Sequence, residues 1–201
     1  MRKSTVLLLS VICVLSMATA AGAATVIFTG DSTLGDLNHD RYYTWGIHTD
    51  WRVPQGEQIA SATLYIDNIN DWQEEATDFL YIHLLDDPGV GVASHYDAQG
   101  NGDAFASWPL IDIYSDNTPP YGENQAGEYK VYPFDSVLLG HLENYIADGE
   151  FGFGFDPDCY FYNDGVRFEI TTSAVPVPPA VLLLGSGLIG IVGLKRKAVI
   201  S

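Results

Sequence analysis

The sequence predicts an all-β domain, built as a two-sheet sandwich of the jelly-roll kind, with one short helix embedded in it. Three observations support this fold class. Short runs rich in β-branched and aromatic residues recur along the chain, and Gly, Pro, Asn and Asp separate them. Two of these runs alternate apolar and polar residues, which is the period of a half-buried strand. A single segment has helical spacing, and seven or more short strands with frequent turns favour a sandwich.

The predicted strands are short and spread over the whole middle of the chain. They are Thr25–Thr29, Tyr42–His48, Ile59–Ile69, Phe79–Leu85, Leu110–Tyr114, Phe151–Phe155 and Val166–Thr171. The alternation is clearest in Ile59–Ile69 and in Phe79–Leu85, where an apolar residue stands at every second position. We expect these two strands to pair with each other in one sheet.

The helical segment runs from Asp135 to Gly149. Its apolar residues recur at helical spacing, at Val137 or Leu138, Leu139, Leu142, Tyr145 and Ile146. Asp135 is a residue type that caps the start of a helix, and Gly149 is one that caps an end. The sequence therefore predicts one short helix between two strands.

Both ends of the chain have the composition of targeting segments. At the amino end, Arg2 and Lys3 precede an apolar run over residues 6–17 and small residues over 18–23, which predicts a secretory signal peptide at residues 1–23. At the other end, an uncharged stretch over residues 180–194 predicts a transmembrane helix at 179–194. The basic residues after such a helix stay on the cytoplasmic side. Residues 24–174 are then the exported domain.

The carboxyl end combines a proline motif, an apolar helix and a basic tail. The motif is Pro176-Val177-Pro178, and the tail is Lys195-Arg196-Lys197. This arrangement over residues 175–197 resembles the PEP-CTERM sorting signal, with Val177 standing where that signal usually has a glutamate. The resemblance implies anchoring in the cell-envelope membrane by the helix, processing by an exosortase-type enzyme, and then a place on the cell surface or outside the cell. It also implies a surface or matrix protein associated with exopolysaccharide.

The exported domain is strongly acidic. Four basic residues stand against all 26 acidic residues of the chain, which leaves a formal charge of −22. Such a surface repels phosphate backbones, so nucleic acid is not an expected partner. Two interpretations remain open: the carboxylates bind divalent cations, or they keep an exported protein soluble.

The densest group of oxygen ligands lies between Phe155 and Gly165. It contains Asp156, Asp158, Asn163 and Asp164, and hard oxygen ligands of this kind suit calcium. The same residues are also common turn formers, so a purely structural role is the alternative. Two other stretches, at residues 36–40 and 97–103, begin like calcium-binding EF-hand loops but lack the glycine or the final glutamate that complete one. Either is a candidate for a looser site.

Aromatic residues and the cysteine give the remaining candidates. Trp72 lies in a polar connection, so its ring is the one most expected to be exposed and to stack on a sugar. Burial in the core is the alternative for the other tryptophans. Cys159 is the one cysteine of the exported domain, which excludes an intramolecular disulfide there and leaves a buried thiol or an intermolecular bridge.

The sequence has no sign of a catalytic centre. It contains no GxSxG elbow and no HExxH motif, and with 26 acidic residues a suitable carboxylate pair is expected by chance. We therefore expect a non-enzymatic surface or matrix protein that has a structural or binding role. The alternative is a secreted carbohydrate-active enzyme, similar to a glycoside hydrolase, on the same scaffold.

Overall fold

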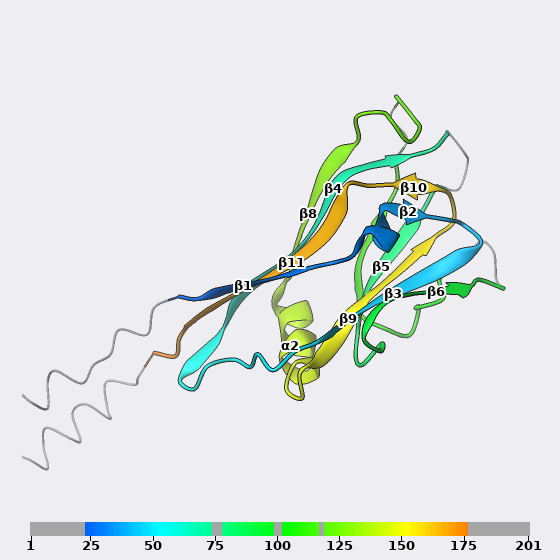
Figure 1. Cartoon of the computed structure of the whole chain (residues 1–201). Helices are drawn as coiled ribbons and strands as arrows, with labels where there is room; N and C mark the ends of the chain where they lie inside the picture. Colours follow the sequence, from blue (N-terminus) through cyan, green and yellow to red (C-terminus); the bar gives the residue numbers. More distant parts are fainter. Residues whose placement is uncertain (1–22, 74–77, 99–101, 117–118, 177–201) are drawn as a thin grey trace, which may run out of the picture.

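The part of the chain that the structure describes folds into two antiparallel sheets and one α-helix (Figure 1). The computed structural model describes residues 23–73, 78–98, 102–116 and 119–176. The sheets pack face to face around one hydrophobic core, so the expectation of a mostly β, two-sheet sandwich with one helix is confirmed.

The first sheet is organised around β4 (Glu57–Asp71), the longest strand of the protein. The other strands of this sheet are β1 (Thr25–Thr29), β2 (Asp36–Leu37), β8 (Glu128–Pro133), β10 (Phe161–Tyr162) and β11 (Gly165–Ala174), and a 3-10 turn, Ser32–Gly35, joins β1 to β2. The order is β1-β11-β4-β10-β2, and β8 pairs with β4. Because β4 and β11 are antiparallel, β11 begins opposite Asp67 and ends opposite Glu57.

The second sheet is organised around β9 (Glu150–Pro157). Its order is β6-β3-β9-β5-β7, in which β3 is Arg41–His48, β5 is Leu80–Leu85, β6 is Gly91–Tyr96 and β7 is Leu110–Tyr114. Phenylalanines at 151, 153 and 155 of β9 are fully buried in the core. Glycines at 152 and 154 occupy the other face, where Pro88 and Phe105 cover them closely.

The core lies between β4 and β11 on one side and β9 on the other. Ala62, Leu64 and Ile66 of β4 are buried, while Thr63 and Tyr65 between them are half-buried, which confirms the predicted alternation. The rings of Phe153 and Phe168 meet edge to face with centroids 4.9 Å apart. Each such large apolar side chain contributes about 1.5–3 kcal/mol through burial.

The expected pairing of the two alternating strands was wrong. β4 belongs to the first sheet and β5 to the second, so they face each other across the core. β4 buries one face against that core, whereas β5 also buries His83 and Leu85 of its other face. Period-two patterning reveals that a strand is half-buried, but it does not reveal which sheet the strand belongs to.

The helix α2 (Ser136–Tyr145) lies inside the predicted segment. The Asp135 side chain caps it as predicted, accepting hydrogen bonds from the backbone N–H groups of Val137 and Leu138, both at 2.9 Å. The predicted end was wrong, because the helix ends at Tyr145 with Ile146 as its cap. Gly149 instead has a φ of +91° and turns the chain into β9.

The start of β1 and the end of β11 lie at the same end of the sandwich (Figure 1). The predicted signal peptide and nearly all of the predicted sorting signal fall outside the described residues. Among the residues that the structure describes, no helix has both the length and the apolar composition needed to cross a membrane.

Candidate functional site

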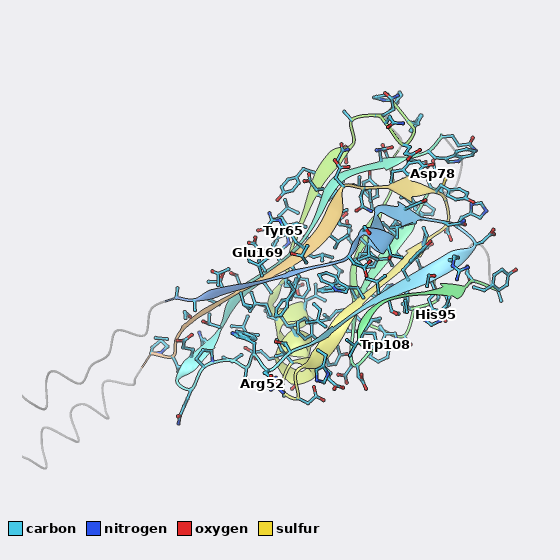
Figure 2. The ribbon with its side chains drawn as sticks, in the orientation of Figure 1. Arg52, Tyr65, Asp78, His95, Trp108 and Glu169 are labelled. Atoms are coloured by element: carbon cyan, nitrogen blue, oxygen red, sulfur yellow. The ribbon has the colours of Figure 1, made fainter. Side chains whose placement is uncertain are left out.

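Buried carboxylates gather at the end of the sandwich opposite the two chain ends. Asp71, Asp78, Asp97, Asp116, Asp156 and Asp158 are all at most 8% exposed. Figure 2 shows Asp78 at this end, far from the start of β1. Within the described part of the chain every lysine and arginine is exposed or half-buried, so none is a buried counter-ion. Buried charges in proteins are normally paired or bound to metal, which makes this end the candidate for cation binding.

One group of carboxylates lies where β9 ends, and we call it the β9 acidic cluster: Asp97, Asp103, Asp156 and Asp158. Asp156 Oδ2 accepts a hydrogen bond from Ala104 N at 2.6 Å, and Asp158 Oδ1 accepts one from Gly102 N at 3.1 Å. These bonds hold the segment after β6 against the end of β9. The second oxygen of Asp156, Oδ1, is buried and has no hydrogen-bond partner. Asp156 itself is only 1% exposed.

The charges of the cluster act on one another. Burial raises the pKa of Asp156 to about 7; the hydrogen bond from Ala104 lowers it, and Asp97, Asp158 and Asp103 raise it further. Burial also raises the pKa of Asp158, against the effect of the Gly102 hydrogen bond and with added repulsion from Asp97 and Asp103. A cation among these side chains would remove this repulsion.

His83 of β5 supplies a partner for one member of the cluster. Its Nε2 lies 3.1 Å from Asp103 Oδ2 and its Nδ1 lies 3.1 Å from the carbonyl oxygen of Trp108. Both ring nitrogens therefore face hydrogen-bond acceptors, and the ring connects Asp103 to the carbonyl group of Trp108. This contact holds Asp103 beside β5.

The structure divides the four residues predicted to bind calcium. Asp156 and Asp158 lie together in the β9 acidic cluster. Asn163 lies elsewhere: its Nδ2 donates to the carbonyl oxygen of Leu34 at 2.6 Å and its Oδ1 accepts from Gly165 N at 3.0 Å. Asp164 is exposed. The partners of Asp156 and Asp158 are instead Asp97 and Asp103, the two ends of a stretch that resembles the start of an EF-hand loop.

The other such stretch, residues 36–40, forms the turn from β2 into β3. Asn38 Oδ1 accepts a hydrogen bond from Asp40 N at 2.8 Å, so this amide stabilises the turn. The carbonyl oxygen of Asp40 accepts from Asp97 N at 2.8 Å. This hydrogen bond joins the turn to Asp97 of the β9 acidic cluster.

A second feature of this end is a polar pocket with a volume of about 220 Å³. Carboxylates, amides and one phenol line it, namely Asp36, Asn68, Asn70, Glu123, Asn124, Tyr162, Asn163 and Asp164, together with Gly35. The pocket lies beside β10, where Tyr162 pairs with both Asn70 and Asp36. Such a lining offers many hydrogen bonds to a ligand rich in hydroxyl groups.

Two aromatic rings lie close to β10. Trp72 is 44% exposed, the most exposed of the four tryptophans, and its backbone N–H donates to the carbonyl oxygen of Tyr160 at 3.0 Å. The two rings have centroids 5.7 Å apart, and the centroid of the half-buried Tyr160 ring lies 4.6 Å from that of His39. Tyr160 directly precedes β10, whose Tyr162 lines the pocket.

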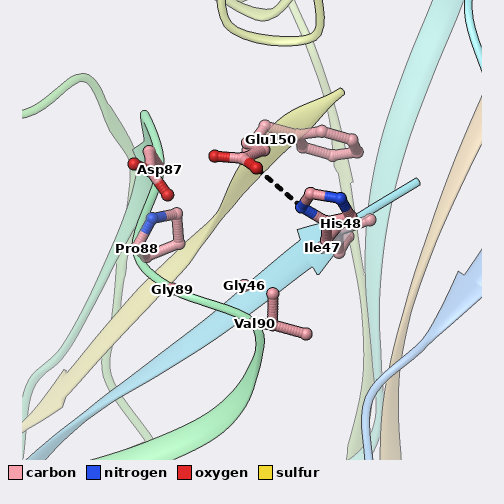
Figure 3. Close-up of a pocket in the computed structure, with 9 residues that line it drawn as sticks. Gly46, Ile47, His48, Asp87, Pro88, Gly89, Val90 and Glu150 are labelled. Carbon is pink, nitrogen blue, oxygen red and sulfur yellow. Dashed lines mark ion pairs between the residues drawn. The ribbon is translucent and has the colours of Figure 1, made fainter. Parts of the chain in front are cut away.

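A third depression lies between β3 and the segment before β6, and Figure 3 shows His48 and Glu150 paired across its edge. His48 Nδ1 lies 2.7 Å from Glu150 Oε1. Its volume of about 30 Å³ holds about one water molecule. It is too small for a sugar ring, so we assign it no function.

No family model matches the chain, and no curated protein is significantly similar to it.

Proposed function

We propose that this is a non-enzymatic exported protein of the cell surface or extracellular matrix, which calcium stabilises and which binds exopolysaccharide. Residues 175–197 deliver it, as a membrane anchor that an exosortase-type enzyme processes. The orders β1-β11-β4-β8 and β3-β9-β5-β7 within the two sheets support the jelly-roll form of the sandwich. Many binding proteins use that architecture as a scaffold.

The observation that carries the calcium proposal is the environment of Asp156. Its Oδ1 is buried without a hydrogen bond, and burial, followed by the neighbouring carboxylates of Asp97, Asp158 and Asp103, raises its pKa. Calcium takes six to eight oxygen ligands at about 2.3–2.6 Å and accepts carboxylates, backbone carbonyls and water together. Asp97, Asp156 and Asp158 supply the carboxylates, and the contact between Asp103 and His83 holds the segment after β6 beside the end of β9.

Calcium is expected to raise the thermal unfolding midpoint of the full-length chain. At about 10 mM calcium, which is a hundredfold over a Kd of about 10⁻⁴ M, native-state binding adds about 2.7 kcal/mol, or roughly 5–10 °C. Calorimetry with calcium and with chelator measures this. Asp156→Asn should abolish the rise, whereas Asp50→Asn at an exposed turn should retain it. An unchanged midpoint in the parent protein would refute calcium binding.

The polar pocket and the rings of Trp72 and Tyr160 support glycan binding. The pocket offers hydrogen-bond partners to hydroxyl groups, and an exposed ring offers its face to a sugar. The pocket also lies away from the chain ends: ten residues of β11, roughly 30 Å of strand, separate Gly165 beside the pocket from Ala174. A protein anchored through its carboxyl end would present this pocket outward. The acidic surface favours neutral glycans, because it repels acidic ones.

Trp72→Ala is expected to weaken binding to neutral polysaccharide about tenfold, which corresponds to about 1.4 kcal/mol and is within the range for one aromatic contact. Affinity electrophoresis of the full-length chain through gels containing a neutral glucan or mannan measures this. Trp108→Ala is the matched control, because Trp108 is 37% exposed but lies against Tyr145, away from the pocket. Equal retardation of all three proteins would contradict the proposed site.

The alternative, a glycoside-hydrolase-like enzyme, has one observation in its favour: Asp36, Glu123 and Asp164 all line the polar pocket. Two carboxylates facing one sugar are the requirement of that chemistry. Release of reducing ends from the retained polysaccharide, lost in Asp36→Asn, would establish the enzyme in place of the binding protein.

A further inference from the structure

A separate group of ligand atoms lies at the same end of the sandwich and has no part in the function proposed above. It consists of Asp71 at the end of β4, Asp78 just before β5, and Cys159 between β9 and β10. All three residues are buried, and one ligand atom from each lies within 4.8 Å of the other two. Cys159 therefore meets two residues of the connection between β4 and β5, which lies far from it in the sequence.

The contacts at this point suit a metal better than a hydrogen-bond network. Cys159 Sγ donates to Asp71 Oδ1 at 3.0 Å. The other oxygen of Asp71, Oδ2, is buried without a hydrogen-bond partner, and the residue is 0% exposed. A tetrahedral zinc ion, with bonds of about 2.0 Å to oxygen and 2.3 Å to sulfur, holds its ligand atoms about 3.5 Å apart. That spacing lies between the 3.0 Å contact and the 4.8 Å limit of the group.

The surroundings fix the ligands in place. Asp71 N donates to Asp116 Oδ2 at 3.3 Å, and Gln73 N donates to Asp71 Oδ1 at 3.4 Å. Burial raises the pKa of Asp71 to about 6, while the Cys159 contact lowers it.

We propose that Asp71, Asp78 and Cys159 form a binding site for a zinc-class divalent cation. On binding, Cys159 loses its thiol proton to solvent and forms a sulfur–metal bond, and the carboxylates of Asp71 and Asp78 each form an oxygen–metal bond. A solvent molecule takes the fourth position. The sulfur selects zinc over calcium, which prefers oxygen alone. The site also explains why a thiol of an exported protein is 1% exposed.

Cobalt(II) reports directly on the thiolate, because it occupies zinc sites and is coloured there. Added to chelator-treated full-length chain, one equivalent should give a thiolate-to-cobalt charge-transfer band and tetrahedral visible bands, and zinc should remove both. Cys159→Ser should lose the charge-transfer band, and Asp71→Asn should weaken binding by at least about a hundredfold, since changes beyond the ligands alone cost 10–100-fold. Cys13→Ser is the matched control and should keep the band.

The proposed zinc site and the proposed calcium site in the β9 acidic cluster can be tested independently of each other. Asp156→Asn should lose the calcium-induced rise of the unfolding midpoint and keep the cobalt spectrum. In the parent protein, mercuration of Cys159 should release one equivalent of zinc, which tests the site even where a variant does not fold. Absence of the charge-transfer band, its persistence in Cys159→Ser, or displacement of cobalt by equimolar calcium would overturn the proposal.

Discussion

Gly46→Ala is expected to destabilise the protein by at least about 3 kcal/mol, the upper part of the range for overpacking a close-packed site. Gly46 lies in β3, and Figure 3 shows the segment from Pro88 to Val90 crossing the strand at this point. A Cβ atom at Gly46 would lie 1.3 Å from the carbonyl oxygen of Gly89 and 2.4 Å from its carbonyl carbon. Both neighbours are backbone atoms, so no side-chain rotation relieves the overlap.

The cross-strand partner of Gly46 limits how far β3 can shift away from Gly89 to relieve this overlap. Gly46 pairs with Gly152 of β9, where an added Cβ atom would lie 2.2 Å from the carbonyl oxygen of Trp45. The two glycines lie side by side beneath the Pro88–Val90 segment. A methyl group at Gly46 therefore requires the backbone of this whole segment to move.

Urea denaturation of Gly46→Ala against the parent protein measures this loss. Gly140→Ala is the matched control, because Gly140 lies on the exposed face of α2 with no atom within 4 Å of an added Cβ. Alanine there should add about 1 kcal/mol, the difference in helix propensity. A Gly46→Ala protein as stable as the parent would show that the Pro88–Val90 segment does not pack on β3 in solution.

Most of the strands that the sequence predicted bury at least one face, whereas β1, whose residues are exposed or half-buried, was recognised from its β-branched and aromatic composition. β1 and β7 have the predicted bounds, and β3, β4, β5, β9 and β11 contain most of theirs. β6 and β8 were missed because most of their residues are exposed or half-buried: β6 runs along the edge of the second sheet, and Tyr132 is the one buried residue of β8. Such strands form because a neighbour offers backbone hydrogen bonds, and local patterning does not record that neighbour.

For the candidate sites too, the local sequence does not record contacts between distant segments. Asp156 and Asp158 stand two residues apart, so their shared location follows from the local sequence. Asp97 reaches them only because β6, β3 and β9 are neighbours in the second sheet, a pairing between distant segments. The grouping of Asp71, Asp78 and Cys159 depends on both sheets. The exposure of Trp72 also followed from its local sequence, because it is a residue of a polar connection.

The metal-free protein is expected to become more stable as the pH falls from 8 to 5. Burial raises the pKa of Asp156 from 3.8 to about 7 and that of Asp71 from 3.8 to about 6. The folded state therefore binds more protons than the unfolded state over this range, and stability rises as each folded carboxyl gains its proton. The two groups together contribute about 4 kcal/mol between pH 8 and pH 5, and this contribution is lost as the pH rises through 6 and 7.

Bound metal reverses this dependence, because a cation stabilises the ionised carboxylate in the fold and protons then compete with it. Urea midpoints of metal-free and calcium-loaded protein, at several pH values and constant salt, separate the two cases. Metal-free Asp156→Asn should be more stable than the parent at pH 8, since the amide keeps the Ala104 hydrogen bond without a charge, and should converge with it at pH 5. A general loss of surface repulsion would stabilise both proteins equally on acidification. Parallel pH profiles would therefore contradict a buried, uncompensated charge at Asp156 and, with it, the reason for a cation in the β9 acidic cluster.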